Sequence, residues 1–157
     1  MIRAGGVFIF IMGVGVMLGA LVPNRRRSLL IIGAAVATIA IVSLAARLSA
    51  PFGAPTSLQF WFLFGSIAAE AILIRVAVVL YRRASERSLL LAILFAVGLH
   101  FLPMTVAFGP PCAALGVTLC VCAGVGLWLW PGVPLNKLWA IDGFIKMAFG
   151  AVMFLAR

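Results

Sequence analysis

The sequence has few charged residues and almost no acidic ones. Of its 157 residues, 10% are charged, and three of these are Asp or Glu against 12 Lys and Arg. A soluble domain has roughly a quarter of its residues charged, because its surface must be hydrated. So few charges exclude a water-soluble globular fold, and lipid is the expected solvent around most of the chain.

Residues that bind metals or form disulfides are also scarce. The chain has one His and three Cys, at positions 112, 120 and 122. An odd number of Cys beside one apolar run does not make a disulfide framework, and a lone His lacks the spacing of a metal site. Cys120 and Cys122 would point about 200° apart on a helix, so they could not chelate Cu(I) together. We expect free thiols, no metal and no other cofactor.

The excess of basic residues raises the question of nucleic-acid binding, because the net charge is +9. The Lys and Arg residues, however, cluster in short breaks between apolar runs, with no basic amphipathic helix or aromatic-basic stripe. Basic residues beside apolar segments orient membrane proteins and contact anionic lipid headgroups. We therefore expect membrane lipids, and not nucleic acid, as their partners.

Apolar residues make up 66% of the chain and form six long runs. A helix that crosses the hydrocarbon core needs about 17–25 consecutive apolar residues. The predicted spans are residues 4–22, 29–46, 57–81, 88–108, 112–130 and 138–156. The sequence thus predicts an all-α fold, a polytopic bundle of six transmembrane helices with short loops, forming one transmembrane domain over residues 1–157.

The basic residues predict an orientation, because positive loops face the cytoplasm. One side holds Arg25, Arg26, Arg27, Arg82, Arg83, Arg87 and Lys137, and the other side holds Arg3, Arg47 and Arg157. The first group is expected in the cytoplasm, which places both termini outside. Aromatic residues typical of a membrane interface agree with these boundaries, namely Tyr81, Trp128, Trp130 and Trp139 on the cytoplasmic side and Trp61 on the other.

Five ionisable residues lie inside the predicted spans: Glu70, Arg75, His100, Asp142 and Lys146. Each costs at least a few kcal/mol at the bilayer centre unless it is paired or hydrated. At about 1.5 Å per residue, they fall into two layers of similar depth. Arg75 can meet Asp142 in one layer, and Glu70 can meet Lys146 or His100 in the other.

These residues have two interpretations. Asp142 and Lys146 are four residues apart and could neutralise each other on one helix face, and buried ion pairs can hold helices together without binding anything. Glu70 has no such neighbour, so its charge must be balanced by a partner from another span, hydrated in a water-filled cavity, or removed by a proton. The five residues are therefore candidates either for substrate or ion binding and a proton relay, or for structural ion pairs.

His100 lies three residues before Pro103. Because Pro103 cannot donate to the carbonyl of Leu99, a helix kink is expected there, with a free acceptor beside the imidazole. A free carbonyl and an imidazole at a kink suit an ion or proton site. A histidine that hydrogen-bonds between helices is the simpler alternative.

Small residues recur at helical spacing in two of the runs. Their positions are Cys112, Gly116, Cys120 and Gly124 in one run, and Gly15 and Gly19 in the other. Small side chains let helix backbones approach closely in lipid, where apolar burial gives little drive for association. These series predict close helix contacts, within one protomer or between protomers.

The segment Gly98–Met104 reads GLHFLPM and lies in a short multipass chain with arginine-rich turns. In these features the chain resembles small uncharacterised bacterial membrane proteins that cross the inner membrane several times. The resemblance implies a bacterial inner-membrane location and implies nothing about activity.

Three functions fit the sequence. The first is small-molecule, ion or proton-coupled transport by a homo-oligomer, through the five ionisable residues. The second is a non-enzymatic membrane subunit or assembly factor of a larger complex, in which the ion pairs are structural. A lipid-modifying membrane enzyme is least favoured, because His100 stands alone and the loops are too short to build a catalytic site at the interface.

Overall fold

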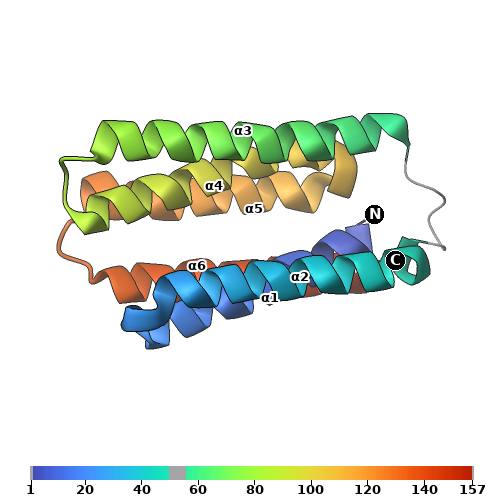
Figure 1. Cartoon of the computed structure of the whole chain (residues 1–157), viewed down its shortest axis with the longest axis horizontal. Helices are drawn as coiled ribbons and strands as arrows, with labels where there is room; N and C mark the ends of the chain where they lie inside the picture. Colours follow the sequence, from blue (N-terminus) through green and yellow to red (C-terminus); the bar gives the residue numbers. More distant parts are fainter. Residues whose placement is uncertain (1, 50–55, 157) are drawn as a thin grey trace. The chain divides into compact units, whose positions relative to one another are not determined.

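A computed structural model of the chain describes residues 2–49 and 56–156, apart from the side chains of residues 27, 41, 42 and 44–49. Arg157 and the side chains of Arg27 and Arg47, which enter the orientation argument, lie outside this description. None of the described residues forms a strand. The helices are α1 (Ile2–Leu21), α2 (Arg26–Ser49), α3 (Ser57–Tyr81), α4 (Glu86–Phe108), α5 (Pro110–Gly124) and α6 (Leu135–Leu155) (Figure 1). The predicted all-α fold is confirmed.

Five of these helices are long and apolar enough to cross a membrane, counted over the described residues. They are α1, α3, α4, α6 and α5 together with the π-helical turn η3 (Val125–Leu129) that continues it. In α2, the apolar stretch of described residues is Ser28–Ala40, which is shorter than a span. Helix lengths and composition therefore support a multipass membrane protein, and the span predicted at 29–46 stays a prediction.

Helix boundaries differ from the predicted spans mainly at the N-termini. Ser85 caps α4 by accepting a hydrogen bond from the Ser88 N–H, so the helix includes Glu86 and begins two residues early. In α6, the Lys137 N–H donates to the Pro134 carbonyl at 3.0 Å, which places Lys137 in the first helical turn. Local capping, which hydrophobicity does not report, sets these ends.

The turn between α4 and α5 is a single residue, Gly109. Its φ angle is 88°, a conformation that glycine adopts readily because it has no Cβ atom. Its N–H donates to the Thr105 carbonyl at 2.8 Å, which ends α4. Pro110 then begins α5, where its missing N–H is not needed and its fixed φ suits the first helical turn.

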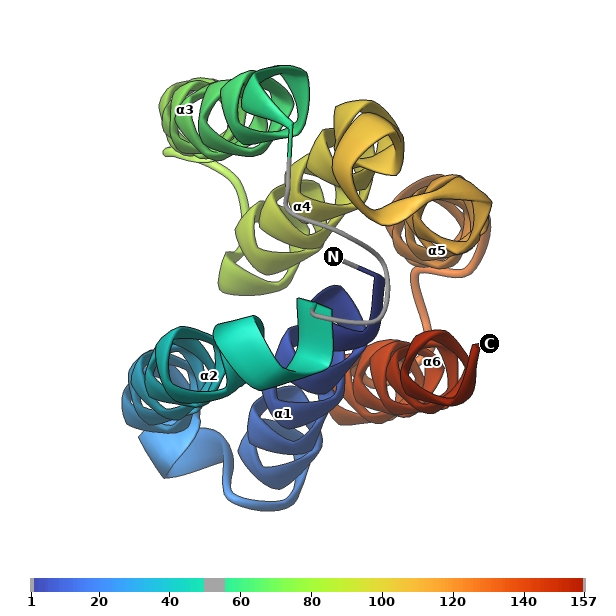
Figure 2. The same cartoon turned by 90° about the vertical axis from the view of Figure 1, so that its right-hand side faces the viewer.

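The chain groups into two compact units, and the single transmembrane domain stays a prediction. Unit 1 comprises Met1–Thr56 and Trp139–Arg157, and unit 2 comprises Ser57–Leu138. Unit 1 thus contains α1, α2 and most of α6, with α1 lying between the other two (Figure 2). Unit 2 contains α3, α4 and α5, with α4 in the middle. Each unit therefore has a central helix that packs on both sides.

Glycines hold α1 and α6 of unit 1 close together. A Cβ atom at Gly13 would lie 2.7 Å from the Gly143 carbonyl oxygen, and one at Gly150 would lie 2.7 Å from the Gly6 oxygen. Gly6 and Gly13 are seven residues apart, as are Gly143 and Gly150, so each pair lies on one helix face. The two helices run antiparallel, with their backbones in direct contact.

The predicted series Gly15 and Gly19 lies at other contacts of α1. A Cβ atom at Gly15 would lie 3.2 Å from the Cα atom of Gly33 in α2, so these two backbones are also close. At Gly19 the neighbours are the side chains of Arg26 and Trp139. Gly15 thus faces a helix, whereas Gly19 faces side chains.

The longer predicted series packs α5 against α4 in unit 2. A Cβ atom at Gly116 would lie 2.8 Å from the Gly98 carbonyl oxygen, and one at Gly98 would lie 2.7 Å from the Cys120 sulfur. Cys112 is fully buried. Gly124, at the end of the series, has the Trp128 ring within 3.0 Å of its Cβ position. The contact therefore lies within one protomer, and it fixes the orientation of α4.

Candidate functional site

One stripe of small and polar residues on α3 faces α4. Most of α3 is exposed, and its buried residues are Ser66 and Ala77. Glu70 lies four residues after Ser66 and seven before Ala77, so the three side chains share a helix face. The Ser66 hydroxyl is satisfied locally, since it donates to the Leu63 carbonyl at 2.8 Å. Glu70 is the ionisable residue of this face.

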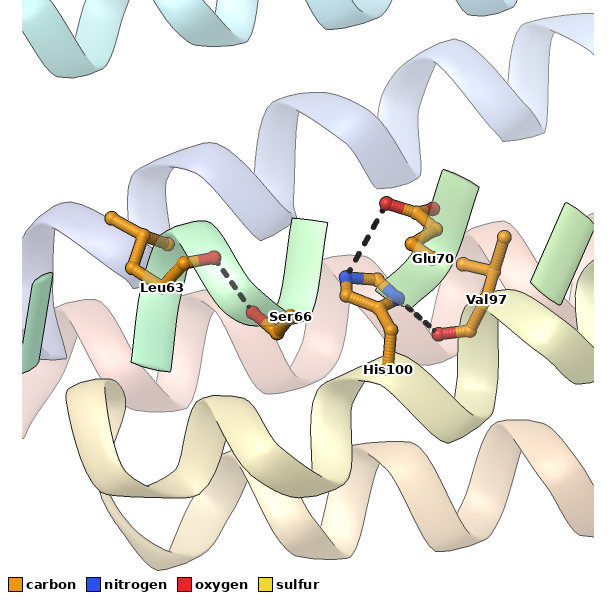
Figure 3. Close-up of polar contacts among 5 residues, drawn as sticks. All are labelled: Leu63, Ser66, Glu70, Val97 and His100. Carbon is orange, nitrogen blue, oxygen red and sulfur yellow. Dashed lines mark hydrogen bonds and ion pairs between the residues drawn. The ribbon is translucent and has the colours of Figure 1, made fainter. Parts of the chain in front are cut away.

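His100 extends from α4 toward this stripe. Its Nδ1 atom lies 2.6 Å from the Val97 carbonyl oxygen, and its Nε2 atom lies 3.8 Å from Oε2 of Glu70 (Figure 3). A carbonyl only accepts, so this contact assigns a proton to Nδ1. Nε2 is therefore the ring atom that gains or loses a proton, and it is the one that faces the carboxyl group.

The two side chains differ in their access to the surroundings. The His100 side chain is 7% exposed and the Glu70 side chain is 27% exposed. The imidazole is also covered by the Phe101 ring, whose centroid lies 4.3 Å away. The carboxyl group thus lies at the opening of the α3–α4 contact, and the imidazole lies behind it.

Pro103 lies inside α4, one turn beyond His100. A groove of about 300 Å³ runs along the same α3–α4 contact at this level. Its lining residues are Trp61, Phe62, Gly65, Ser66, Ala69 and Pro103. We call the stripe of Ser66 and Glu70, the facing His100 and this groove the α3–α4 seam. The kink at Pro103 stays a prediction.

Asp142 and Lys146 form a separate ion pair in unit 1. The Lys146 Nζ atom donates to Oδ2 of Asp142 at 2.5 Å, and each side chain is 5% exposed. The pair joins successive turns of α6, as their spacing allows. It is therefore a closed arrangement, in which the two charges neutralise each other.

Arg75 takes part in no hydrogen bond or ion pair among the described residues, and its side chain is exposed on α3. Unit 2 brings Glu70 and His100 together, and unit 1 brings Asp142 and Lys146 together. The expected pairs of Arg75 with Asp142, and of Glu70 with Lys146, would join the two units and stay predictions.

Metal ligands are not clustered in the described part of the chain. No group of three or more His, Cys, Asp or Glu residues there could hold a metal ion. Cys112, Cys120 and Cys122, all within the described residues, form no disulfide, and the Cys120 sulfur donates to the Phe95 carbonyl at 3.6 Å. In the seam, a carboxyl group and an imidazole face each other, and two such groups can exchange a proton.

The family model described as "Family of unknown function (DUF6609)" matches residues 1–157. The chain belongs to this family. The DUF6609 match covers both units, so the seam and the α6 ion pair both lie within it. No curated protein and no solved structure matches the chain. The resemblance noted at Gly98–Met104 is thus confirmed as far as an uncharacterised family, and its bacterial location stays a prediction.

Sequence reasoning missed Arg87, which it assigned only to a positive loop. The Arg87 Nη2 atom donates to the carbonyls of Gly126 at 2.8 Å and of Trp130 and Val133 at 3.2 Å. Gly126 lies in η3, and Trp130 and Val133 lie between η3 and α6, close to a helix end where carbonyls lack intrahelical partners. Arg87 therefore ties the start of α4 to the end of the α5 segment.

A second missed contact joins Arg26, Gly19 and Trp139 in unit 1. The Arg26 Nε atom donates to the Gly19 carbonyl at 3.3 Å, and its guanidinium carbon lies 4.9 Å from the Trp139 ring centroid. Trp139 is 1% exposed, so its ring is covered by the protein. The heptad spacing of Gly6, Gly13, Gly143 and Gly150 was readable in the sequence, whereas neither arginine contact was.

Proposed function

We propose that this membrane protein carries out proton-coupled transport of an ion or small molecule, with Glu70 and His100 as its proton site. The observation that supports this function is the geometry at His100. Its Nδ1 proton is held by the Val97 carbonyl, while Nε2 faces the partly exposed carboxyl group of Glu70. An acid and a base that face each other inside a membrane span are rare and costly, which favours a functional role.

The facing pair is neutral when it holds one exchangeable proton. That proton lies either on the carboxyl group, with a neutral imidazole, or on Nε2, with an ionised carboxylate. Adding a second proton leaves a positive charge, and removing the first leaves a negative one. Both charged states cost free energy in a low-dielectric environment. A coupled ion that enters the seam would therefore exchange with the proton.

The other intramembrane charges take different roles in this proposal. Arg75 lies five residues from Glu70 on α3, and its positive charge adjusts the charge balance around the carboxyl group. Lys146 is neutralised by Asp142, so we assign that pair to the stability of unit 1. The protein would act as a homo-oligomer in the bacterial inner membrane, with both termini outside.

Proton movement in reconstituted lipid vesicles that contain a pH-sensitive dye tests this function. Glu70→Gln keeps the shape and hydrogen-bonding capacity of the side chain but removes its proton exchange, so dye-reported proton movement should be lost. His100→Gln should reduce it strongly. The double variant Asp142→Asn/Lys146→Met serves as a control, because it changes only the α6 pair and should behave like the wild type. Full proton movement by folded Glu70→Gln would overturn the proposal.

The alternative, a membrane subunit of a larger complex, is favoured by a different observation. The Asp142–Lys146 pair is closed within one helix, as expected of a purely structural contact. Copurification of a stoichiometric partner in mild detergent, together with wild-type assembly of Glu70→Gln, would support this function. A stable isolated homo-oligomer would count against it.

A further inference from the structure

The groove of the seam has apolar ring side chains along its walls and open space at Gly65. The indole of Trp61 and the ring of Phe62 line it from α3, and Pro103 lines it from α4. Between them, Gly65 has no atom within 4 Å of its Cβ position, so this part of the groove is open. Its volume of about 300 Å³ is sufficient for a small aromatic or alkyl group.

Glu70 lies immediately beside this groove. Ser66 and Ala69 line the groove, and Glu70 follows on the same side of α3, about 6 Å along the helix axis from Ser66. Its carboxyl group is the partly exposed member of the pair with His100. A molecule in the groove can therefore place one end against the aromatic rings and the other end against the carboxyl group.

We infer that the α3–α4 seam binds a hydrophobic organic cation, whose apolar body fills the groove and whose positive charge lies against Glu70. This inference rests on the proposed function and names its substrate class. Charge complementarity favours a cation over a neutral lipid chain, because Glu70 directly follows the groove-lining residue Ala69 and is the acidic residue of the seam.

Binding of the cation requires release of the seam proton. The Glu70–His100 pair is neutral with one exchangeable proton, and a monovalent cation would make the seam positive unless that proton left. The carboxyl group ionises, its proton passes to solvent, and the cation takes its place, so the total charge is unchanged. The seam therefore exchanges one proton for one organic cation.

Calorimetric titration of the full chain in lipid nanodiscs with benzyltrimethylammonium tests the exchange. A pH indicator in weakly buffered solution should report about one proton released for each cation bound. Neopentylbenzene has the same shape with carbon in place of the charged nitrogen, and it should release none. Equal binding of both compounds would show an apolar groove for lipid chains only, and binding without proton release would likewise overturn the inference.

Two variants of α3 locate the binding site. Gly65→Leu fills the open part of the groove and should weaken binding of benzyltrimethylammonium at least tenfold. Ala71→Leu places the same Leu side chain at an exposed position of the same helix that does not line the groove, and it should bind like the wild type. Unchanged affinity of a folded Gly65→Leu variant would show that the groove is not the site.

The inference and the proposed function can fail separately. Glu70-dependent proton movement in vesicles without benzyltrimethylammonium binding would overturn the substrate class alone. Proton release on binding, without Glu70-dependent proton movement in vesicles, would overturn transport and leave a cation-binding site. Glu70→Asp keeps the charge and should retain measurable binding, whereas Glu70→Gln should lose it.

Discussion

The two intramembrane ion pairs show two ways of placing charge inside a helical membrane protein. Asp142 and Lys146 lie on one helix, with Nζ of Lys146 2.5 Å from Oδ2 of Asp142 and each side chain 5% exposed. Glu70 and His100 lie on two helices, Nε2 of His100 lies 3.8 Å from Oε2 of Glu70, and the Glu70 side chain is 27% exposed. A pair within one helix is set by the helix geometry alone. A pair between helices depends on protonation and on the separation of the helices, so it can respond to a ligand.

The Asp142–Lys146 pair lies in tighter helix packing than the Glu70–His100 pair. Lys146 lies three residues after Gly143 and four before Gly150, so it shares the face of α6 on which the backbones of α1 and α6 touch. No water can follow the charges into such a contact without separating the helices. The seam, in contrast, opens into a groove beside Glu70. Tight packing thus accompanies the closed pair, and open packing accompanies the pair that exchanges protons.

The two pairs should differ most in how much free energy of unfolding is lost when one charge of the pair is removed. Asp142→Asn leaves the Lys146 ammonium buried without its carboxylate, and breaking a buried pair costs about 3–5 kcal/mol. The free energy of unfolding, followed by circular dichroism in mixed micelles of mild detergent and dodecyl sulfate, should fall by this amount. The helices of unit 1 should also lose their fixed packing.

The double variant Asp142→Asn/Lys146→Met is the control for this cost. Removing both charges removes the penalty, because no buried charge is left without a partner. Its free energy of unfolding should return to within about 1 kcal/mol of the wild type. A double variant as unstable as Asp142→Asn would mean that the pair does more than neutralise itself.

Arg87→Met tests whether a charged side chain also stabilises unit 2. The guanidinium group donates to three carbonyls in η3 and the loop after it, and hydrogen bonds to a charged group contribute about 1.5–3 kcal/mol each in favourable cases. We expect a loss of roughly 2–3 kcal/mol in the free energy of unfolding, measured in the same micelles. Arg82→Met, at an exposed position, should change stability little. Equal effects of the two variants would assign Arg87 to general charge rather than to this contact.

Two glycines compare the packing of the units directly. A Cβ atom at Gly13 would lie 2.7 Å from backbone atoms of both Gly143 and Met147, so Gly13→Ala should cost about 2 kcal/mol through overpacking. Gly65 has nothing within 4 Å of its Cβ position, so Gly65→Ala should be neutral or stabilising by up to about 1 kcal/mol through helix propensity. Thermal unfolding in detergent measures both. A destabilised Gly65→Ala variant would mean that the groove is closed in solution.

The sequence predicted the helical fold well because lipid leaves the chain few alternatives. Without water in the hydrocarbon core, backbone groups must pair within a helix, so long apolar runs such as 57–81 become helices with nearly the predicted bounds. Helix starts at Glu86 and Leu135 were missed because caps set them. Which helices pack together in each compact unit was not predictable either, because hydrophobicity does not encode helix pairing.

The candidate site was only partly readable. Depth along the helices correctly placed Glu70 at the level of His100, and the four-residue spacing allowed the pair of Asp142 and Lys146. The direction of each side chain was not readable, because it depends on how each helix is rotated about its axis. The role of the Val97 carbonyl in fixing the His100 proton, and the groove beside Glu70, therefore emerged only from the structure.

The smallest expected effect is that of Glu70→Gln on stability, and it completes the comparison with Asp142. The Glu70 carboxyl group is partly exposed and lies 3.8 Å from Nε2 of His100, so the attraction contributes at most about 1 kcal/mol. The variant should unfold within that range of the wild type, while it loses proton movement. A loss as large as that of Asp142→Asn would make the seam a structural contact as well.

This small contribution should depend on pH in a characteristic way. The attraction needs an ionised carboxylate and a protonated imidazole at the same time. Acidification protonates the carboxylate, and alkalinisation removes the proton from Nε2, so the attraction weakens on both sides of an intermediate range. The difference in free energy of unfolding between the wild type and Glu70→Gln should therefore pass through a maximum with pH. The difference between the wild type and Gly65→Ala, which changes no ionisable group, should show no such maximum. A difference that stays constant with pH would mean that the pair does not share a proton, which would remove the main reason to treat the two pairs as different.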